Sequence, residues 1–207
     1  MKILNLYAGV GGNRRLWGGN HDVVAVEIDQ KICAEYSRLY PDDQIINVDA
    51  HQYLLDHFAE YDFIWSSPPC PTHGKMAKSR WHFHKNPEYP DMRLYQEIIL
   101  LQHIFKGKFV VENVMPYYRP LIRETVKLGR HLFWSNFDIP ERDFRMKYPN
   151  GGHNQGLITL TVSELEDLHD LRLTPGKLNR MAALRNYVDP RVGRYILECA
   201  KGANHAS

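Results

Sequence analysis

The chain has 207 residues, with 26 Lys and Arg against 24 Asp and Glu, which gives a formal net charge of +2. A net charge so close to zero does not by itself indicate a nucleic-acid partner, so any surface that binds one must be local. A hydrophobic share of 43% excludes a disordered chain, and the short apolar runs exclude a membrane-spanning helix. Three widely spaced cysteines, Cys33, Cys70 and Cys199, indicate a reducing compartment, so a cytoplasmic protein is expected.

Short apolar runs alternate with helical stretches over the first two thirds of the chain. The predicted strands cover residues 2–8, 23–28, 44–48, 62–67 and 108–114, and the predicted helices between them cover 30–40, 50–58 and 91–105. This alternation predicts an α/β fold, a doubly wound and mostly parallel sheet with helices on both faces. The first run leads into glycines and is interpreted as a strand, not as a signal peptide.

The last third continues with a strand within 130–139 and with helices over 163–171, 177–184 and 190–201. Ser163 and Glu166 have capping-box spacing, and Pro190 suits the first turn of the last helix. Two stretches interrupt the pattern, one over 68–90 with five prolines and one over 141–161 rich in Gly, Asn and charge. A loop as long as the first is usually functional in a compact domain.

Polar or glycine-rich residues follow each of the first three predicted strands. A glycine turn, residues 9–12, follows the first, Glu27 ends the second and Asp49 follows the third. Ligands of open α/β sheets bind beyond the carboxyl ends of the strands, and an acid at the second strand suits ribose hydroxyls. The three features together predict a site for an adenosine-type cofactor, although a glycine turn alone is also found in ordinary strand-to-helix connections.

Two reactive side chains follow the next two strands. Cys70 comes directly after Pro68 and Pro69, a rigid segment that can present a thiol nucleophile. Glu112 ends the fifth strand, where partial burial would favour a protonated acid able to donate a proton. The structural alternatives are a buried cysteine, as expected for Cys33 and Cys199, and a solvated carboxylate.

A metal site is the weaker interpretation of the same region. Cys70, His73, His82 and His84 are residue types that bind zinc. A zinc base deaminase would need a His-x-Glu motif and a Pro-Cys-x-x-Cys motif, and both are incomplete here. We therefore predict no metal.

These elements, in this order, resemble the cytosine-5 DNA methyltransferase family. The run from Asn5 to Gly12 resembles the first motif of that family, Val26 to Asp29 the second, Pro68 to Cys70 and Glu112 to Val114 two catalytic motifs, and Arg185 to Val192 the last motif. The resemblance touches both ends of the chain. It implies the Rossmann-like fold of S-adenosylmethionine-dependent methyltransferases and S-adenosylmethionine as cofactor.

The family motifs assign roles to individual residues. The resemblance implies cofactor contacts from Tyr7, Gly9, Gly11, Gly12, Glu27, Ile28, Asp49, Pro68 and Asn186, with Glu27 on the ribose and Ile28 beside the adenine. It implies that Cys70 is the nucleophile and Glu112 the acid on ring nitrogen 3. Residues 141–145 weakly match the arginine motif, which leaves Arg142 or Arg145 for the carbonyl oxygen of the base.

The resemblance implies a methyl transfer to carbon 5 of cytosine in double-stranded DNA. A thiolate that adds to carbon 6 makes carbon 5 nucleophilic toward a sulfonium methyl group. Carbon 6 is inaccessible in a stacked duplex, so the base must be flipped out. The long loop after Cys70 is then expected to contact the DNA, because its basic side chains can bind phosphates. These are Lys75, Lys78, Arg80 and Lys85. A solvated charged loop is the alternative.

Little chain is left for recognising a target sequence. We expect a catalytic and cofactor-binding core over 1–146, a reduced target-recognition segment over 147–172, and C-terminal helices over 173–207 that return to the core. Three interpretations stay open: a compact bacterial or phage enzyme with a short or relaxed target, a catalytic subunit that needs a separate recognition chain, and an RNA-directed or inactive relative. A monomer with no membrane partner is expected.

Overall fold

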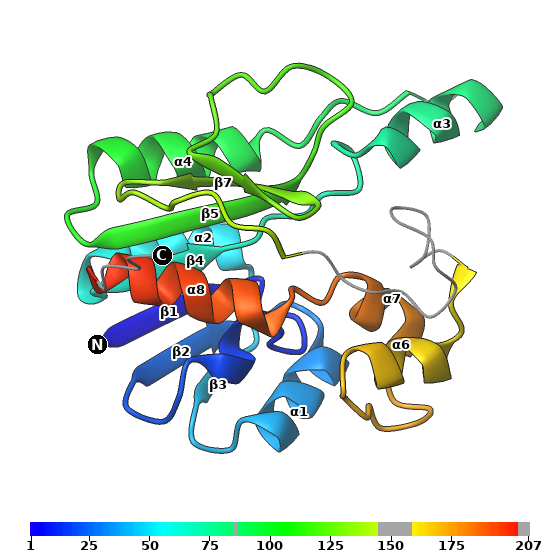
Figure 1. The fold of residues 1–207 in the computed structure, drawn as a ribbon, viewed down its shortest axis with the longest axis horizontal. Coiled ribbons are helices and arrows are strands. Elements are labelled where there is room, and N and C mark those ends of the chain that lie inside the picture. Colours follow the sequence, from blue (N-terminus) through cyan, green and yellow to red (C-terminus); the bar gives the residue numbers. More distant parts are fainter. Residues whose placement is uncertain (85–86, 145–158, 203–207) are drawn as a thin grey trace.

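The structure is a computed structural model, which describes residues 1–84, 87–144 and 159–202, apart from the side chains of 80–84. Within these ranges, strands join into one seven-stranded sheet in the order β3-β2-β1-β4-β5-β7-β6 (Figure 1). The strands are β1 (Lys2–Leu6), β2 (Asp22–Val26), β3 (Gln44–Ile46), β4 (Phe63–Ser66), β5 (Lys108–Val114), β6 (Val126–Leu128) and β7 (His131–Ser135).

The first five strands are parallel, and β7 runs antiparallel between β5 and β6. The predicted α/β fold with a mostly parallel sheet is therefore confirmed. β5 ends where predicted, and β7 ends four residues before the predicted end at residue 139. The strands β1 to β4 end one or two residues earlier than predicted, because the chain turns there. Tyr7, for example, has φ 55° and turns the chain away from β1.

Helices cover both faces of the sheet (Figure 1). α2 (Ala50–His57) and α4 (Arg93–His103) pack on one face, and α8 (Pro190–Ala200) packs on the other. The remaining helices are η1 (Asn13–Leu16), α1 (Gln30–Leu39), η2 (Phe58–Glu60), α3 (Lys75–His84), α6 (Val162–Leu168) and α7 (Arg180–Arg185). None of the helices in the described ranges has the length and apolar character needed to span a bilayer.

Three details differ from the sequence predictions. The stretch 68–90 was expected to be irregular but contains α3, and β6 was not expected. The capping box lies on Thr161 and Glu164, two residues before Ser163 and Glu166. Thr161 has the extended backbone of an N-cap and accepts a hydrogen bond from the Glu164 amide, whereas Ser163 is already inside the helix.

The segment from α6 to α7 is attached to α1 by a buried carboxylate. Glu35 of α1 accepts hydrogen bonds from the Thr174 amide at 3.0 Å and from Arg38 at 2.6 Å. Within the segment, the buried carboxylate of Glu166 accepts from the Leu173 amide and from Arg180, each at 3.1 Å. The described residues from 160 to 187 therefore pack on the rest of the folded body.

Acid is expected to destabilise this segment through His169. Burial, with added repulsion from Arg130 and Arg15, lowers the pKa of His169 to about 4. Its unfolded pKa is about 6.5, so the unfolded chain binds more protons between these values and stability falls as the pH drops from 6.5 to 4, by up to about 3 kcal/mol. Denaturant unfolding at pH 7.5 and 5 measures this loss.

The matched variant is His169→Phe, which keeps an aromatic ring beside Tyr187, whose ring centre lies 4.8 Å away. We expect this variant to lose clearly less stability than the wild type between pH 7.5 and 5. Equal losses in the two proteins would contradict the assignment, because other histidines would then carry the acid sensitivity.

Candidate active site

The predicted site residues meet at one edge of the sheet. Parallel pairing aligns Leu6 with Val26 and Ser66, and aligns Ser66 with Val111. The carboxyl ends of β1, β2 and β4 therefore lie side by side, next to the last residues of β5. Tyr7, Glu27 and Cys70 follow these three strands, Asp49 follows β3, and Glu112 lies within β5, one residue after Val111.

The glycine turn leaves free space at Gly9. This residue has φ 55°, and a Cβ atom built on it would meet nothing within 4 Å. Gly11 has φ 75° and packs against the ring of Tyr40, whose hydroxyl donates to the Gly11 carbonyl at 2.6 Å. Tyr40 thus fixes the turn at Gly11, whereas the turn is open at Gly9, where a ligand can approach the backbone.

Glu27 organises the same turn. Its carboxylate accepts hydrogen bonds from the amides of Gly9 at 3.0 Å, Ile28 at 2.9 Å and Asp29 at 3.0 Å. The Ile28 side chain next to it is 68% exposed, which is unusual for a large apolar residue and leaves it available to a ligand. Asp49 accepts from the Gln52 amide at 3.0 Å and so begins α2 at this edge.

The C-terminal segment closes on the turn at Gly12. A Cβ on Gly12 would lie 2.4 Å from the Val188 carbonyl oxygen and 2.8 Å from its nitrogen. Asn186 is exposed and ends α7 just before this contact. The predicted last motif therefore lies against the predicted first motif.

Gly12→Ala is expected to lower the free energy of unfolding by about 1–3 kcal/mol, because the new methyl group overlaps backbone atoms that cannot turn aside. Gly12 has φ −58°, so steric overlap and not backbone strain causes the loss. Gly19→Ala is the control, since a Cβ there meets nothing within 4 Å. Denaturant titrations compare the two, and equal stabilities would contradict the close contact.

The Cys70 loop is fastened at both sides. The Asn113 amide group donates to the Pro68 carbonyl at 2.9 Å, which joins the loop to the end of β5. The amides of His73 and Gly74 donate to the Cys70 carbonyl at 3.0 Å and 3.3 Å. Cys70 itself is partly exposed, so the loop presents the thiol from a fixed backbone.

The environment of the Cys70 thiol is electrostatically mixed. Burial and the nearby Glu112 carboxyl raise the pKa of Cys70, and the positive charge of Arg130 opposes them. Glu112 is buried, and its Oε1 lies 3.4 Å from Nε2 of His131. Burial also lowers the pKa of His131, so this imidazole is neutral near pH 7. Because its pKa is raised, the Cys70 thiol becomes a thiolate only where a nearby group stabilises the negative charge.

Arg130 is a site residue that the sequence reasoning missed. It precedes β7, the strand that pairs antiparallel with β5, and it donates to the Arg185 carbonyl at 2.5 Å. Arg142, by contrast, lies over the rings of Phe144 and Tyr195, at 5.7 Å and 5.2 Å from their centres. Arg145 lies outside the described residues.

His73, a candidate ligand in the rejected zinc interpretation, is fully buried and already bonded. Its Nε2 lies 3.0 Å from the Asp91 carbonyl, which can only accept, so Nε2 carries the proton and Nδ1 accepts from the Tyr118 hydroxyl at 2.5 Å. The side chains of His82 and His84 lie outside the described residues. No group of three or more potential metal ligands is found among the described residues.

The basic loop residues are placed on a projecting element. α3 extends away from the body of the molecule (Figure 1), and Lys75 and Lys78 on it are exposed. The base of this arm is anchored, because the Asp91 amide donates to the Thr72 hydroxyl at 2.9 Å. The Arg80 side chain and Lys85 lie outside the described residues.

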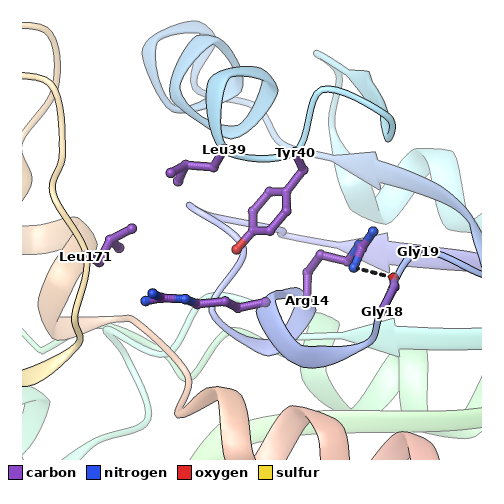
Figure 2. A pocket seen from close by; sticks show the side chains of 7 residues that line it. Arg14, Gly18, Gly19, Leu39, Tyr40 and Leu171 are labelled. Carbon is purple, nitrogen blue, oxygen red and sulfur yellow. Dashed lines mark hydrogen bonds between the residues drawn. The ribbon is translucent and has the colours of Figure 1, made fainter.

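A cleft lies next to Tyr40, the residue whose hydroxyl is bonded to Gly11 (Figure 2). Its lining residues are Arg14, Arg15, Gly18, Gly19, Leu39, Tyr40 and Leu171. Arg14 is bound to both carboxylate oxygens of Asp43 and to the Gly18 carbonyl. The polar groups of this cleft therefore serve the fold, and the predicted residues at the strand ends lie elsewhere.

Comparisons with known proteins place the chain in a family. Residues 1–120 match the model of the C-5 cytosine-specific DNA methylase family. A curated relative, type II methyltransferase M1.HphI of Haemophilus parahaemolyticus, is 27% identical over 123 residues, 55% of this chain and 32% of that protein. The chain thus spans about a third of that relative's length.

Solved structures show the same fold over nearly the whole chain. The Entamoeba histolytica methyltransferase EhMeth has a TM-score of 0.56 at 11% identity, covering 98% of each chain. A mutant of Spodoptera frugiperda DNMT2 has a TM-score of 0.60 at 15% identity, covering 97% of this chain and 99% of that one. The fold, the order of the site residues and the match over 1–120 together show that the chain belongs to the C-5 cytosine-specific DNA methylase family.

Proposed function

We propose that the chain transfers a methyl group from S-adenosylmethionine to carbon 5 of a flipped-out cytosine in double-stranded DNA, through a covalent Cys70 adduct. The observation that carries this proposal is the placement of Cys70 and Glu112 on adjacent strand ends, beside an open glycine turn. A module that only bound adenosine would not need a thiol and a buried acid together at this edge.

The residues around the turn suit S-adenosylmethionine. Gly9 leaves space for the ligand, Glu27 is placed for ribose hydroxyls, and the exposed Ile28 offers an apolar surface to an adenine ring. Asp49 and Asn186 are proposed for the adenine amino group and for closing the pocket, with further contacts from Tyr7, Gly11, Gly12 and Pro68. The cofactor supplies an electrophilic sulfonium methyl group.

The chain's own residues perform the remaining steps. The Cys70 thiolate adds to carbon 6 of the cytosine while the Glu112 carboxyl gives a proton to ring nitrogen 3, which makes carbon 5 a nucleophile. Arg130 favours the thiolate by its charge, and Arg142 and Arg145 stay candidates for the carbonyl oxygen of the base. After methyl transfer a base removes the carbon-5 proton, and the thiolate leaves.

The arm that carries α3 is proposed to bind DNA. Lys75 and Lys78 are exposed residues of α3, which extends away from the body (Figure 1), and Arg80 and Lys85 belong to the same arm in the sequence. Charges so placed can bind the phosphates on either side of a flipped nucleotide. The setting proposed is a bacterial or phage restriction-modification system in the cytoplasm, by analogy with the curated relative.

A catalytic subunit with a separate recognition chain is the second candidate. It is favoured by the attachment of residues after 160 to α1, through Glu35 and Thr174 among others, because these residues are not free to form a recognition domain. A compact enzyme with a relaxed target is consistent with the same observation.

Incubation of the purified chain with labelled S-adenosylmethionine and double-stranded DNA, followed by sequencing of the modified cytosines, tests the proposal. We expect label at carbon 5 of cytosine, in a short or relaxed sequence context. Cofactor binding without transfer to any DNA would overturn the stand-alone enzyme, and activity restored by a co-expressed chain would support the second candidate. Transfer to RNA alone would assign an RNA substrate.

A further inference from the structure

Glu97 is a buried carboxylate that receives three hydrogen bonds from the site. Its side chain has no exposed surface. Its Oε1 accepts from the Tyr7 hydroxyl at 2.5 Å and lies 2.8 Å from Nδ1 of His51, and its Oε2 accepts from the Ser66 hydroxyl at 2.5 Å.

The three donors belong to three elements of the site edge. Tyr7 directly follows β1, Ser66 ends β4 just before the Cys70 loop, and His51 lies in the first turn of α2 after Asp49. Glu97 itself lies on α4, which packs under the sheet. One carboxylate thus joins the cofactor side of the site to the loop that carries the thiol.

Tyr7 is the residue that most needs such a bond. Its φ of 55° is strained for a residue with a side chain, and a strained backbone persists only where its surroundings hold it. The Tyr7 ring packs against the edge of the core, and its hydroxyl donates a hydrogen bond to Glu97. Loss of this bond would free the residue that begins the glycine turn.

His51 makes the arrangement sensitive to protons. Its bond to Glu97 raises the pKa of His51, with Asp49 adding to the effect and with burial and Arg93 opposing it. The imidazolium is therefore favoured in the folded chain, and its attraction to Glu97 is lost as the pH rises through the raised pKa. Tyr7 and Ser66 face the same carboxylate and carry no charge near neutral pH.

We propose that Glu97 is a positioning residue that holds Tyr7 and Ser66 in place for the cofactor and the Cys70 loop, and that its pairing with protonated His51 strengthens this hold. The proposal rests on the proposed function, because it assumes that the turn after Tyr7 binds S-adenosylmethionine. It adds a pH-dependent cofactor affinity to that function.

The test is the binding of S-adenosylhomocysteine, measured by calorimetry at pH 6 and pH 8.5 for the wild type and Tyr7→Phe. The wild type is expected to bind several times more weakly at pH 8.5. Tyr7→Phe keeps the ring but loses the bond, so we expect binding about tenfold weaker at pH 6 and nearly independent of pH. Tyr53→Phe is the control, because the Tyr53 hydroxyl is bonded to Tyr61 and not to Glu97.

Glu97→Gln separates charge from shape. Its amide oxygen can still accept from Tyr7 and His51 while its NH₂ group donates to the Ser66 hydroxyl, so we expect a folded protein whose binding no longer depends on pH. A Tyr7→Phe protein with wild-type affinity and pH dependence would overturn the inference alone. A wild type that binds no S-adenosylhomocysteine would overturn the cofactor assignment as well.

Discussion

Cys70→Ala is expected to abolish methyl transfer to DNA, with a loss of about a thousandfold or more, because no other group can form the bond to carbon 6. Cys70 follows the end of β4, and the charges of Glu112 and Arg130 act on its thiol. A variant without the thiol keeps the glycine turn and Glu27, so cofactor binding should change little. Transfer of label from S-adenosylmethionine measures the first quantity, and calorimetry the second.

Cys199→Ala is the matched control for this prediction. Cys199 is also a partly buried free cysteine, but it lies on α8 near Tyr195, away from the strand ends. We expect this variant to retain wild-type transfer.

A duplex that contains 5-fluorocytosine gives a second readout. The fluorine blocks removal of the group at carbon 5, so the wild type and Cys199→Ala should form a covalent adduct that survives denaturation, and Cys70→Ala should form none. Substantial transfer by Cys70→Ala would exclude a covalent mechanism through this thiol.

The main features of the sheet and the site edge could be predicted because local patterns carry them. β5 is predicted with its observed bounds, since a short β-branched apolar run is a sign of a buried strand. Glu27 follows such a run in β2, Glu112 follows the run within β5, and parallel pairing through β1 and β4 brings the two acids to one edge of the sheet. Position along the chain was enough in these cases.

Features that depend on distant contacts could not be predicted in this way. Arg130 precedes β7 and comes close enough to oppose the raised pKa of Cys70 because β7 pairs antiparallel with β5. Glu97 has partners 90, 46 and 31 residues away in the sequence, so no local pattern marks it. α3 lies between proline-rich segments, and the bridge between Gly74 and Pro116 fixes where its arm leaves the body.

Glu112→Gln is expected to reduce methyl transfer by about a hundredfold or more, the usual cost of losing a general acid. The amide has nearly the same shape and can still occupy the buried position next to His131, but it cannot give a proton to ring nitrogen 3. Single-turnover transfer at saturating cofactor separates this chemical step from binding.

The same substitution should make the Cys70 thiol easier to ionise. The ionised form of Glu112, which has to take up a proton before it can act as an acid, raises the pKa of Cys70. Its removal should lower that pKa, and Arg130 would then favour the thiolate without opposition from the carboxylate. Alkylation of Cys70 by iodoacetamide, followed by mass spectrometry across pH, should show its midpoint shifted to lower pH.

The two effects have opposite signs, which makes the role of Glu112 distinguishable. If Glu112 served only to activate the nucleophile as a base, Glu112→Gln would slow both alkylation and methyl transfer. If it acts as an acid on the base ring, alkylation becomes faster at a given pH while transfer falls. If Glu112→Gln is alkylated faster at Cys70 but transfers methyl groups more slowly, the substitution has removed proton donation and has not impaired formation of the thiolate.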